Sequence, residues 1–265
     1  MSWRLNRVHL LDIFPAMSRS EQIVAWLREH ANAAGAHGFT FGLSGGIDSA
    51  VVARLCQLAT PGHVTGVLLP CYSQPQDEHD ARVVADAFGI PVLRVDLTRT
   101  FDALTDALDH ALTGVPARVD VVDIKQRLPR VNIKPRLRMT ALYYVANSQN
   151  ALVAGTGNRS EITLGYYTKY GDGGVDVLPI GNLLKSEVRA MAAELGVPQP
   201  VIDKAPTAGL WPGQTDEAEM GFTYDALELY LNNGRTAVPD AVADRIESLR
   251  HVSDHKRALP PIAMV

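Results

Sequence analysis

The sequence predicts an α/β fold in which helices cover both faces of a parallel five-stranded sheet. Short apolar runs alternate with helical segments of a dozen or so residues, and glycine or proline separates most of them. Apolar residues make up 46% of the 265 residues and charged residues 20%, so a sizeable core can form. We expect one domain over residues 1–265, with a core over about 19–196 and a C-terminal helical tail over about 222–265.

The elements follow from local signals, taken in chain order. A first helix is expected from Ser18, because Glu21 stands three residues later, as in a capping box. Strands are expected over residues 39–43, 64–69, 91–97, 151–155 and 177–180. Further helices are expected from residue 50 and over residues 75–88, 98–112, 135–147, 184–195, 224–231 and 239–253. Residues 158–174 contain too much glycine for a regular element.

Composition excludes several classes of protein. The formal net charge is −4 without a long basic run, so we expect no nucleic-acid partner. Cys56 and Cys71 stand too far apart for a CxxC site, which fits a reducing compartment. The apolar stretch near the N-terminus is broken by Asp12 and Pro15, and no run reaches the roughly 20 apolar residues of a membrane helix. We therefore expect a cytoplasmic protein without a membrane partner.

A glycine-rich loop stands between the first expected strand and the next helix. It consists of Gly42, Leu43, Ser44, Gly45, Gly46, Ile47, Asp48 and Ser49. Glycines let backbone N–H groups approach an anion, and the helix directs its positive end to the same point, so the loop is a candidate phosphate site. Asp48 fits there if a divalent cation bridges its carboxylate and the phosphate. The alternative is a tight turn with Asp48 or Ser49 as helix N-cap.

The loop resembles the pyrophosphate-binding loop of the N-type ATP pyrophosphatases, which cleave ATP between the α and β phosphates. It is neither a Walker A loop nor a dinucleotide fingerprint, because the lysine of the former and the glycine spacing of the latter are missing. Later strings, and the terminal His-Lys-Arg, are similar in order to those of the NAD synthetase family. They lie at residues 132–139, 155–161, 168–174, 204–210 and 255–257.

The resemblance implies a role for individual residues. Asp48 and Glu161 would bind Mg²⁺, which prefers hard oxygen ligands. ATP, a co-substrate, would contact the loop together with Thr156, Lys185 and Thr207. The second substrate would contact Arg136, Lys169, Asp176, His255 and Lys256. Asp172 would receive ammonia, and Asp48, Lys185 and Asp172 would be the catalytic residues.

Position alone leaves other interpretations open for several of these residues. Lys185 stands at a helix start, where the macrodipole disfavours a cation, so an anionic partner is favoured over a plain surface role. Glu161 near a helix start could act only as a favourable dipole residue. His255 and Lys256 would otherwise be solvated tail residues. Arg159 stands where the family commonly has lysine, and the tail after Arg257 is less basic than usual.

The fold implied by the family is Rossmann-like, of the adenine nucleotide alpha hydrolase type. The implied reaction is ATP-dependent amidation of nicotinic acid adenine dinucleotide (deamido-NAD), giving NAD, AMP and pyrophosphate through an NAD-adenylate. The synthetase strings begin by residue 42, so we expect no amidase domain, and ammonia would be free or come from a separate amidase subunit. Family members are homodimers, and we expect the same here. The alternatives are another amide-forming ligase of the group, or a non-catalytic adenine-nucleotide-binding protein.

Overall fold

A parallel sheet of four strands, in the order β3-β2-β1-β4, forms the centre of the computed structural model, which describes residues 17–115, 128–204 and 215–263. β1 (Gly38–Gly42) pairs with β2 (Val64–Leu68) on one side and with β4 (Ala151–Val153) on the other. β3 (Val92–Arg94) lies beyond β2. The parallel α/β fold is thus confirmed.

The prediction of a fifth strand over residues 177–180 is wrong. The segment makes a single parallel bridge, between Val177 and Ala154 at the end of β4. Pro179 has no N–H to donate to a ladder, and residues 178–181 turn, with the Gly181 N–H donating to the Leu178 carbonyl at 3.1 Å. The apolar residues at 177–180 therefore form a turn beside the sheet and not a strand.

Four helices and a short fifth one pack on one face of the sheet. They are α1 (Arg19–Ala33), α2 (Ile47–Ala59), α3 (Pro75–Phe88), α8 (Lys185–Glu194) and α9 (Gln199–Ile202). The largest apolar cluster joins these helices to the strands, with Leu27, Phe39 and Phe41 fully buried. The capping box at the start of α1 is confirmed, because the Glu21 N–H donates to Ser18 Oγ and the Ser18 N–H to Glu21 Oε2.

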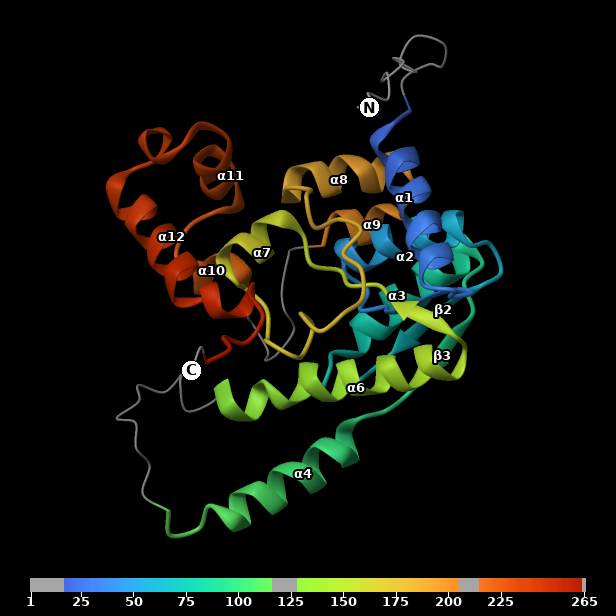
Figure 1. Ribbon diagram of the computed structural model, residues 1–265, viewed down its shortest axis with the longest axis horizontal. Coiled ribbons are helices and arrows are strands. Elements are labelled where there is room, and N and C mark those ends of the chain that lie inside the picture. Colours follow the sequence, from blue (N-terminus) through green and yellow to red (C-terminus); the bar gives the residue numbers. More distant parts are fainter. Residues whose placement is uncertain (1–16, 116–127, 205–214, 264–265) are drawn as a thin grey trace, which may run out of the picture.

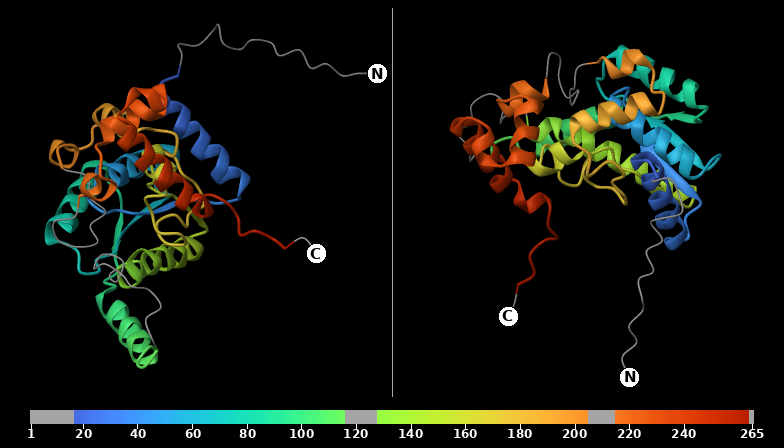
Figure 2. Two further views of the ribbon diagram at one scale, coloured as in Figure 1. Left: turned by 90° about the vertical axis from the view of Figure 1, so that its left-hand side faces the viewer. Right: turned by 90° about the horizontal axis from the view of Figure 1, so that it is seen from above.

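The opposite face is covered by α6 (Ile133–Ser148), which runs along β1 and β4 (Figure 1). A second apolar cluster fixes it there and includes Val67 of β2, Phe101 and Val145. Phe101 belongs to α4 (Thr98–Ala111), which projects away from the rest of the molecule in Figures 1 and 2. Helices thus cover both faces of the sheet, as the sequence predicted.

A third group of helices lies beside the sheet (Figures 1 and 2). It consists of α7 (Arg159–Leu164), α10 (Asp216–Met220), α11 (Tyr224–Asn233) and α12 (Asp240–Val252), with the 3₁₀ turns Arg235–Ala237 and Asp254–Lys256. They share a third apolar cluster around Leu164, Leu227 and Ile246. The expectation of no regular element over residues 158–174 was wrong, because Asn158 caps α7 and Gly165 ends it in the left-handed conformation. Within the described residues, no helix is long and apolar enough to cross a membrane.

Candidate active site

The glycine-rich loop lies at the carboxyl end of β1, the strand at which the order of the sheet reverses. From β1 the chain proceeds to β2 and β3 on one side, whereas β4 lies on the other side. Ligands of open α/β sheets bind in the crevice at such a switch point. α2 begins there with Gly46 as N-cap, which has no side chain to accept from the amides of the first turn. Its amide donors therefore remain available to an anion.

Gly45 brings the loop against the start of α3. Its φ of +78° lies in the left-handed region, and a Cβ at this position would stand 2.4 Å from the carbonyl oxygen of Asp77. The two serines hold the loop from within. Ser49 Oγ donates to the Gly46 carbonyl at 2.8 Å, and Ser44 Oγ donates to Ser49 Oγ at 3.1 Å. The loop shape is thus set before any ligand binds.

Three charged side chains from different elements meet beside the loop. Lys185, the first residue of α8, is 4% exposed, and its Nζ contacts Asp48 Oδ2 of α2. The same Nζ lies 3.8 Å from Glu161 Oε1 of α7. Asn158 Nδ2 donates to Asp48 Oδ1 at 3.1 Å and so fixes the second carboxylate oxygen. The structure therefore brings Asp48, Glu161 and Lys185 together, and the anionic partner expected for Lys185 is a pair of carboxylates.

Burial and mutual charge perturb these groups. Burial raises the pKa of Glu161, and the neighbouring Asp48 carboxylate raises it further. Burial by itself would lower the pKa of Lys185, but Asp48 and Glu161 outweigh it and the pKa lies above its ordinary value. The ammonium is thus retained inside the site, where it can neutralise an anion.

The two carboxylates also suit Mg²⁺. Magnesium in nucleotide sites takes one or two carboxylates and completes its shell with phosphate oxygens and water. The side chains of Asp48 and Glu161 are 17% and 18% exposed, so both are open to a ligand. No group of three or more potential ligands occurs among the residues that the structure describes. The pair therefore fits a cation bound jointly with nucleotide phosphates.

A second group gathers at the C-terminal end of the chain. Arg136 on α6 donates to the Lys169 carbonyl at 3.4 Å, and Lys169 Nζ donates to the His255 carbonyl at 2.6 Å. Lys256 Nζ donates to the carbonyls of Gly165 (2.7 Å) and Tyr167 (2.6 Å). Gly165 is the C-cap of α7, whose first turn carries Glu161 of the loop site. α7 therefore connects the two groups.

Asp172 lies in the loop between these groups. Its Oδ1 accepts from the Thr168 N–H at 2.9 Å. The residue is exposed at the surface, yet desolvation of its carboxylate by the surrounding protein raises its pKa, although the Thr168 hydrogen bond, Lys256 and Arg138 oppose this effect. Such a carboxylate has the chemistry to hold ammonium or to take its proton.

The remaining expected residues are placed differently. Thr156 lies just after β4 and is half-buried, and Thr207 falls outside the described residues. Asp176 binds within the protein, accepting from the Val153 N–H at 2.8 Å and from the Tyr143 hydroxyl at 2.9 Å. Its carboxylate therefore has a structural partner on each oxygen.

Sequence reasoning missed three residues of the site. Asn158 fixes Asp48 and caps α7, and the spacing Asn158-x-x-Glu161 is a capping-box signal that could have revealed it. Asp216 and Tyr224, from α10 and α11, are buried close to Lys185. No sequence signal marks this last pair, because only the tertiary fold brings it to the site.

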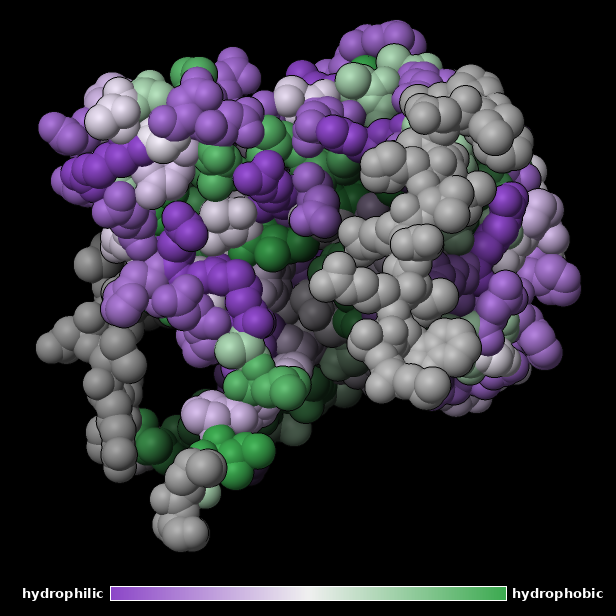
Figure 3. Space-filling view, turned by 45° about the horizontal axis from the view of Figure 1, so that its top comes forward, coloured by the Kyte–Doolittle hydropathy of each residue, from purple (hydrophilic) through white to green (hydrophobic). Residues whose placement is uncertain are grey.

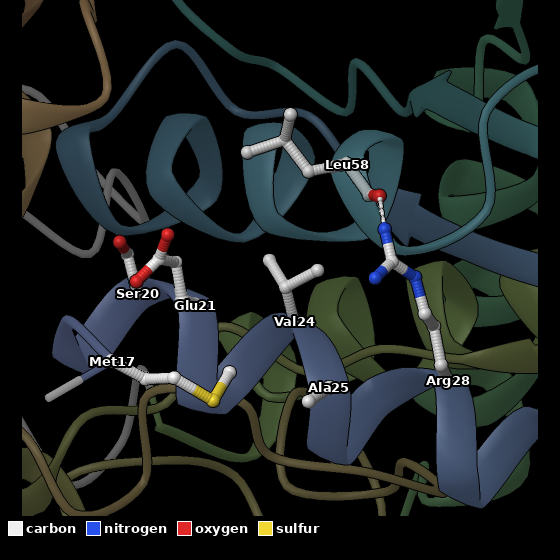
Figure 4. A pocket seen from close by; sticks show the side chains of 7 residues that line it. All are labelled: Met17, Ser20, Glu21, Val24, Ala25, Arg28 and Leu58. Atoms are coloured by element: carbon white, nitrogen blue, oxygen red, sulfur yellow. Dashed lines mark hydrogen bonds between the residues drawn. The ribbon is translucent and has the colours of Figure 1, made fainter. Parts of the chain in front are cut away.

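A separate pocket of about 340 Å³ lies between α1 and α2 (Figure 4). Its lining consists of Met17, Ser20, Glu21, Val24, Ala25, Arg28 and Leu58. Arg28 already donates to the Leu58 carbonyl at 2.7 Å, as the figure shows. None of the loop-site residues lines this pocket.

A glycine-rich loop at a switch point, with an acidic pair and a buried lysine beside it, is the arrangement expected of a nucleotide-using α/β enzyme. A family model described as NAD synthase matches residues 19–260, and the chain belongs to this family, as the sequence predicted. The NH(3)-dependent NAD(+) synthetase of Carboxydothermus hydrogenoformans is 47% identical over 247 residues, covering 93% of this chain and 97% of that protein.

Two solved structures show the same fold. The NMN synthetase from Francisella tularensis has a TM-score of 0.83 at 36% identity and covers 94% of this chain and 99% of that one. The NH3-dependent NAD synthetase from Campylobacter jejuni, in complex with the nitrate ion, has a TM-score of 0.73 at 27% identity, with 93% and 97% covered.

Proposed function

We propose that the chain is an ammonia-dependent NAD synthetase, which amidates deamido-NAD at the expense of ATP. The contact of Lys185 with Asp48, beside Glu161 and the start of α2, is the observation that carries the proposal. It supplies a cation, an acidic pair and backbone donors at one point, which is what an adenylation of a carboxylate requires.

In the first step, the nicotinate carboxylate attacks the α-phosphorus of ATP and pyrophosphate leaves. The amides at the start of α2, with Ser44 and Ser49, bind the departing phosphates. Lys185 neutralises charge that develops between the α and β phosphates. Asp48 and Glu161 would hold Mg²⁺, which when bound neutralises phosphate charge and orients the oxygens. The product of this step is the NAD-adenylate.

In the second step, ammonia attacks the activated acyl carbon and AMP leaves. A free carboxylate resists attack because its leaving group would be oxide, whereas AMP is a good leaving group. Asp172, in the loop over residues 168–174, would hold ammonium and accept its proton. Arg136, Lys169, His255 and Lys256 would bind the dinucleotide. Hydrogen bonds link the first three in a chain beside the start of α6, from Arg136 to the Lys169 carbonyl and from Lys169 to the His255 carbonyl.

A mononucleotide substrate is the second candidate, favoured by the 36% identity and TM-score of 0.83 to an NMN synthetase. Both acids present the same nicotinate carboxylate for adenylation, and they differ in the size of the nucleotide attached to it.

Mass spectrometry of the products separates the candidates. Purified chain is incubated with ATP, Mg²⁺ and ammonium, and with either deamido-NAD or nicotinate mononucleotide. We expect NAD and AMP from the dinucleotide at the higher kcat/KM. A higher value for the mononucleotide would assign the second candidate, and absence of AMP with both acids would refute ligase activity.

The proposal includes a homodimer located in the cytoplasm. α4 carries an apolar stripe of Leu104, Leu108 and Leu112, exposed by 39%, 43% and 59%, and Tyr144 of α6 is 79% exposed. In Figure 3, hydrophobic residues are visible between mostly hydrophilic parts of the face turned toward the viewer. Stripes of this kind are typical of surfaces covered by a second subunit. Both cysteines, Cys56 and Cys71, are buried thiols, which suits a reducing compartment.

A further inference from the structure

Asp216 is a buried carboxylate beside the loop site to which the reaction above gives no role. It is the first residue of α10 and is 4% exposed. Its Oδ2 accepts from the Tyr224 hydroxyl at 2.8 Å, whereas its Oδ1 is buried and makes no hydrogen bond within the geometric limits to any described residue; the Tyr166 hydroxyl is a second neighbour of this carboxylate. A buried carboxylate oxygen without a partner costs free energy, so its retention calls for a reason.

Tyr224 connects this carboxylate to Lys185. The ring centroid of Tyr224 lies 5.5 Å from Lys185 Nζ, within the range of a cation–π contact. The ring is fixed at its other side, because Tyr224 is 6% exposed and packs with Leu227 and Ile246. The hydrogen bond to Asp216 fixes the hydroxyl end, so the ring has one orientation toward the lysine.

The charges of the site explain why Lys185 needs the contacts from Tyr224 and Asp216. Lys185 now contacts Asp48 and lies near Glu161, the same two carboxylates that suit Mg²⁺. If these carboxylates held a cation, the lysine would lose its nearest anions. The ring of Tyr224 and the field of Asp216 remain, because neither side chain is among the cation's expected ligands.

We propose that Asp216 and Tyr224 position Lys185 for the adenylation step by holding its ammonium toward the nucleotide phosphates. Both act through the lysine and are positioning residues. The inference rests on the proposed function only for the turnover arm of its test, since nucleotide binding is measured without the acid substrate.

The test is a double-mutant cycle. Asp216→Asn and Tyr224→Phe are each combined with Lys185→Met, and calorimetry gives the Kd for α,β-methylene-ATP with Mg²⁺. AMP release by each variant, with the acid that the wild type uses, gives kcat and KM for ATP.

We expect each single change to lower kcat about tenfold, more than it alters KM for ATP, because the lysine acts on charge that develops in the transition state. In the Lys185→Met background the same changes should have less than about a twofold effect. The effects on Kd should likewise be non-additive. The Kd of each double variant should differ by about fivefold or more from the value expected if the two single changes acted independently. Tyr224→Leu, which also removes the ring, should lose more activity than Tyr224→Phe.

Tyr230 provides a matched control on the same helix. Its hydroxyl donates to Glu247 Oε1 at 3.1 Å, which joins α11 to α12 and does not involve Lys185. Tyr230→Phe should leave kcat unchanged and be additive with Lys185→Met. The proposal would be overturned if each change lowered kcat equally with Lys185 in place and in the Lys185→Met background. It would also be overturned if Asp216→Asn and Tyr224→Phe both folded and kept the wild-type kcat. If Asp216→Asn does not fold, Tyr224→Phe decides, because it removes a single oxygen atom.

Discussion

Gly45 is the glycine at which the glycine-rich loop is most constrained. Alanine there would adopt a φ of +78° and place its Cβ 2.4 Å from the Asp77 carbonyl. We expect Gly45→Ala to displace the loop from the start of α3 and to weaken ATP binding by at least about tenfold, with a loss of about 2–3 kcal/mol of stability. Calorimetry with ATP and thermal unfolding measure the two effects.

Gly62 is the control for backbone strain. Its φ is +79°, but a Cβ would meet nothing within 4 Å. Gly62→Ala therefore carries the same strain without the clash, and it should cost about 1–2 kcal/mol and leave ATP affinity intact. Equal ATP affinities for the two variants would contradict the close approach of the loop to α3.

Asp48 is predicted to be indispensable because of its charge. Asparagine keeps the shape and can still accept from Asn158, yet it leaves Lys185 with Glu161 as its nearest carboxylate. We expect Asp48→Asn to lower AMP release by more than about a hundredfold, with circular dichroism unchanged. Near-normal turnover over a magnesium titration would refute the metal role.

Much of the loop site could be predicted from sequence. Asp48 and Ser49 follow two glycines at a strand–helix junction, and phosphate binding by this pattern stays a prediction. The alternative, with Asp48 or Ser49 as helix N-cap, is wrong, because Gly46 is the N-cap of α2. An anionic partner could be predicted for Lys185, because the helix macrodipole disfavours an unpaired cation at a helix start. Asp216 and Tyr224 could not be predicted, because their role depends on where α10 and α11 fold back. Asp176 was expected to bind substrate, yet both of its oxygens have partners within the protein.

At the scale of elements, helices were predicted more accurately than strands. α3 begins at Pro75 and ends before Gly89, as expected, because proline and glycine act locally. Strand bounds depend on partners that are distant in sequence. β3 was expected over residues 91–97 but covers Val92–Arg94, since β2 offers it only three paired residues. α7 was missed because six helical residues give too short a periodic signal.

α4 is the element that tests the assembly. A glutamate at position 108 would place a charge in the middle of its exposed apolar stripe. We expect Leu108→Glu to convert the dimer to a monomer in light scattering coupled to size-exclusion chromatography, because burying an unpaired charge costs several kcal/mol. Thermal unfolding of the monomer reports whether the fold survives.

His110→Glu is the matched change on the same helix. It adds the same charge two residues further along, on the other side of α4, where it lies outside the stripe. This variant should remain dimeric. A wild-type chain that elutes as a monomer, or a Leu108→Glu variant that stays dimeric, would exclude α4 as the interface.

The choice of nitrogen donor, ammonia or glutamine, is a property of the whole molecule. The NAD synthase match covers residues 19–260, and the relative from Carboxydothermus hydrogenoformans is aligned over 97% of its length. We expect the purified chain to form amide product from ammonium and to form at most about one hundredth as much from glutamine, since none of its expected site residues is a thiol nucleophile. Equal rates with both donors would contradict the assignment. A rate with glutamine that appears only when a second protein is added would identify a separate amidase.

The carboxylate of Asp176 has a consequence for solubility. The outermost strand of a sheet usually leaves amides open to pairing with another chain, and such an edge promotes aggregation. At Val153 the amide is taken by Asp176 Oδ2, and the carbonyl accepts from the N–H groups of Asp176 and Val177. An incoming strand would find no hydrogen-bonding group of Val153 left to recruit, so this border of the sheet resists fibril-like growth.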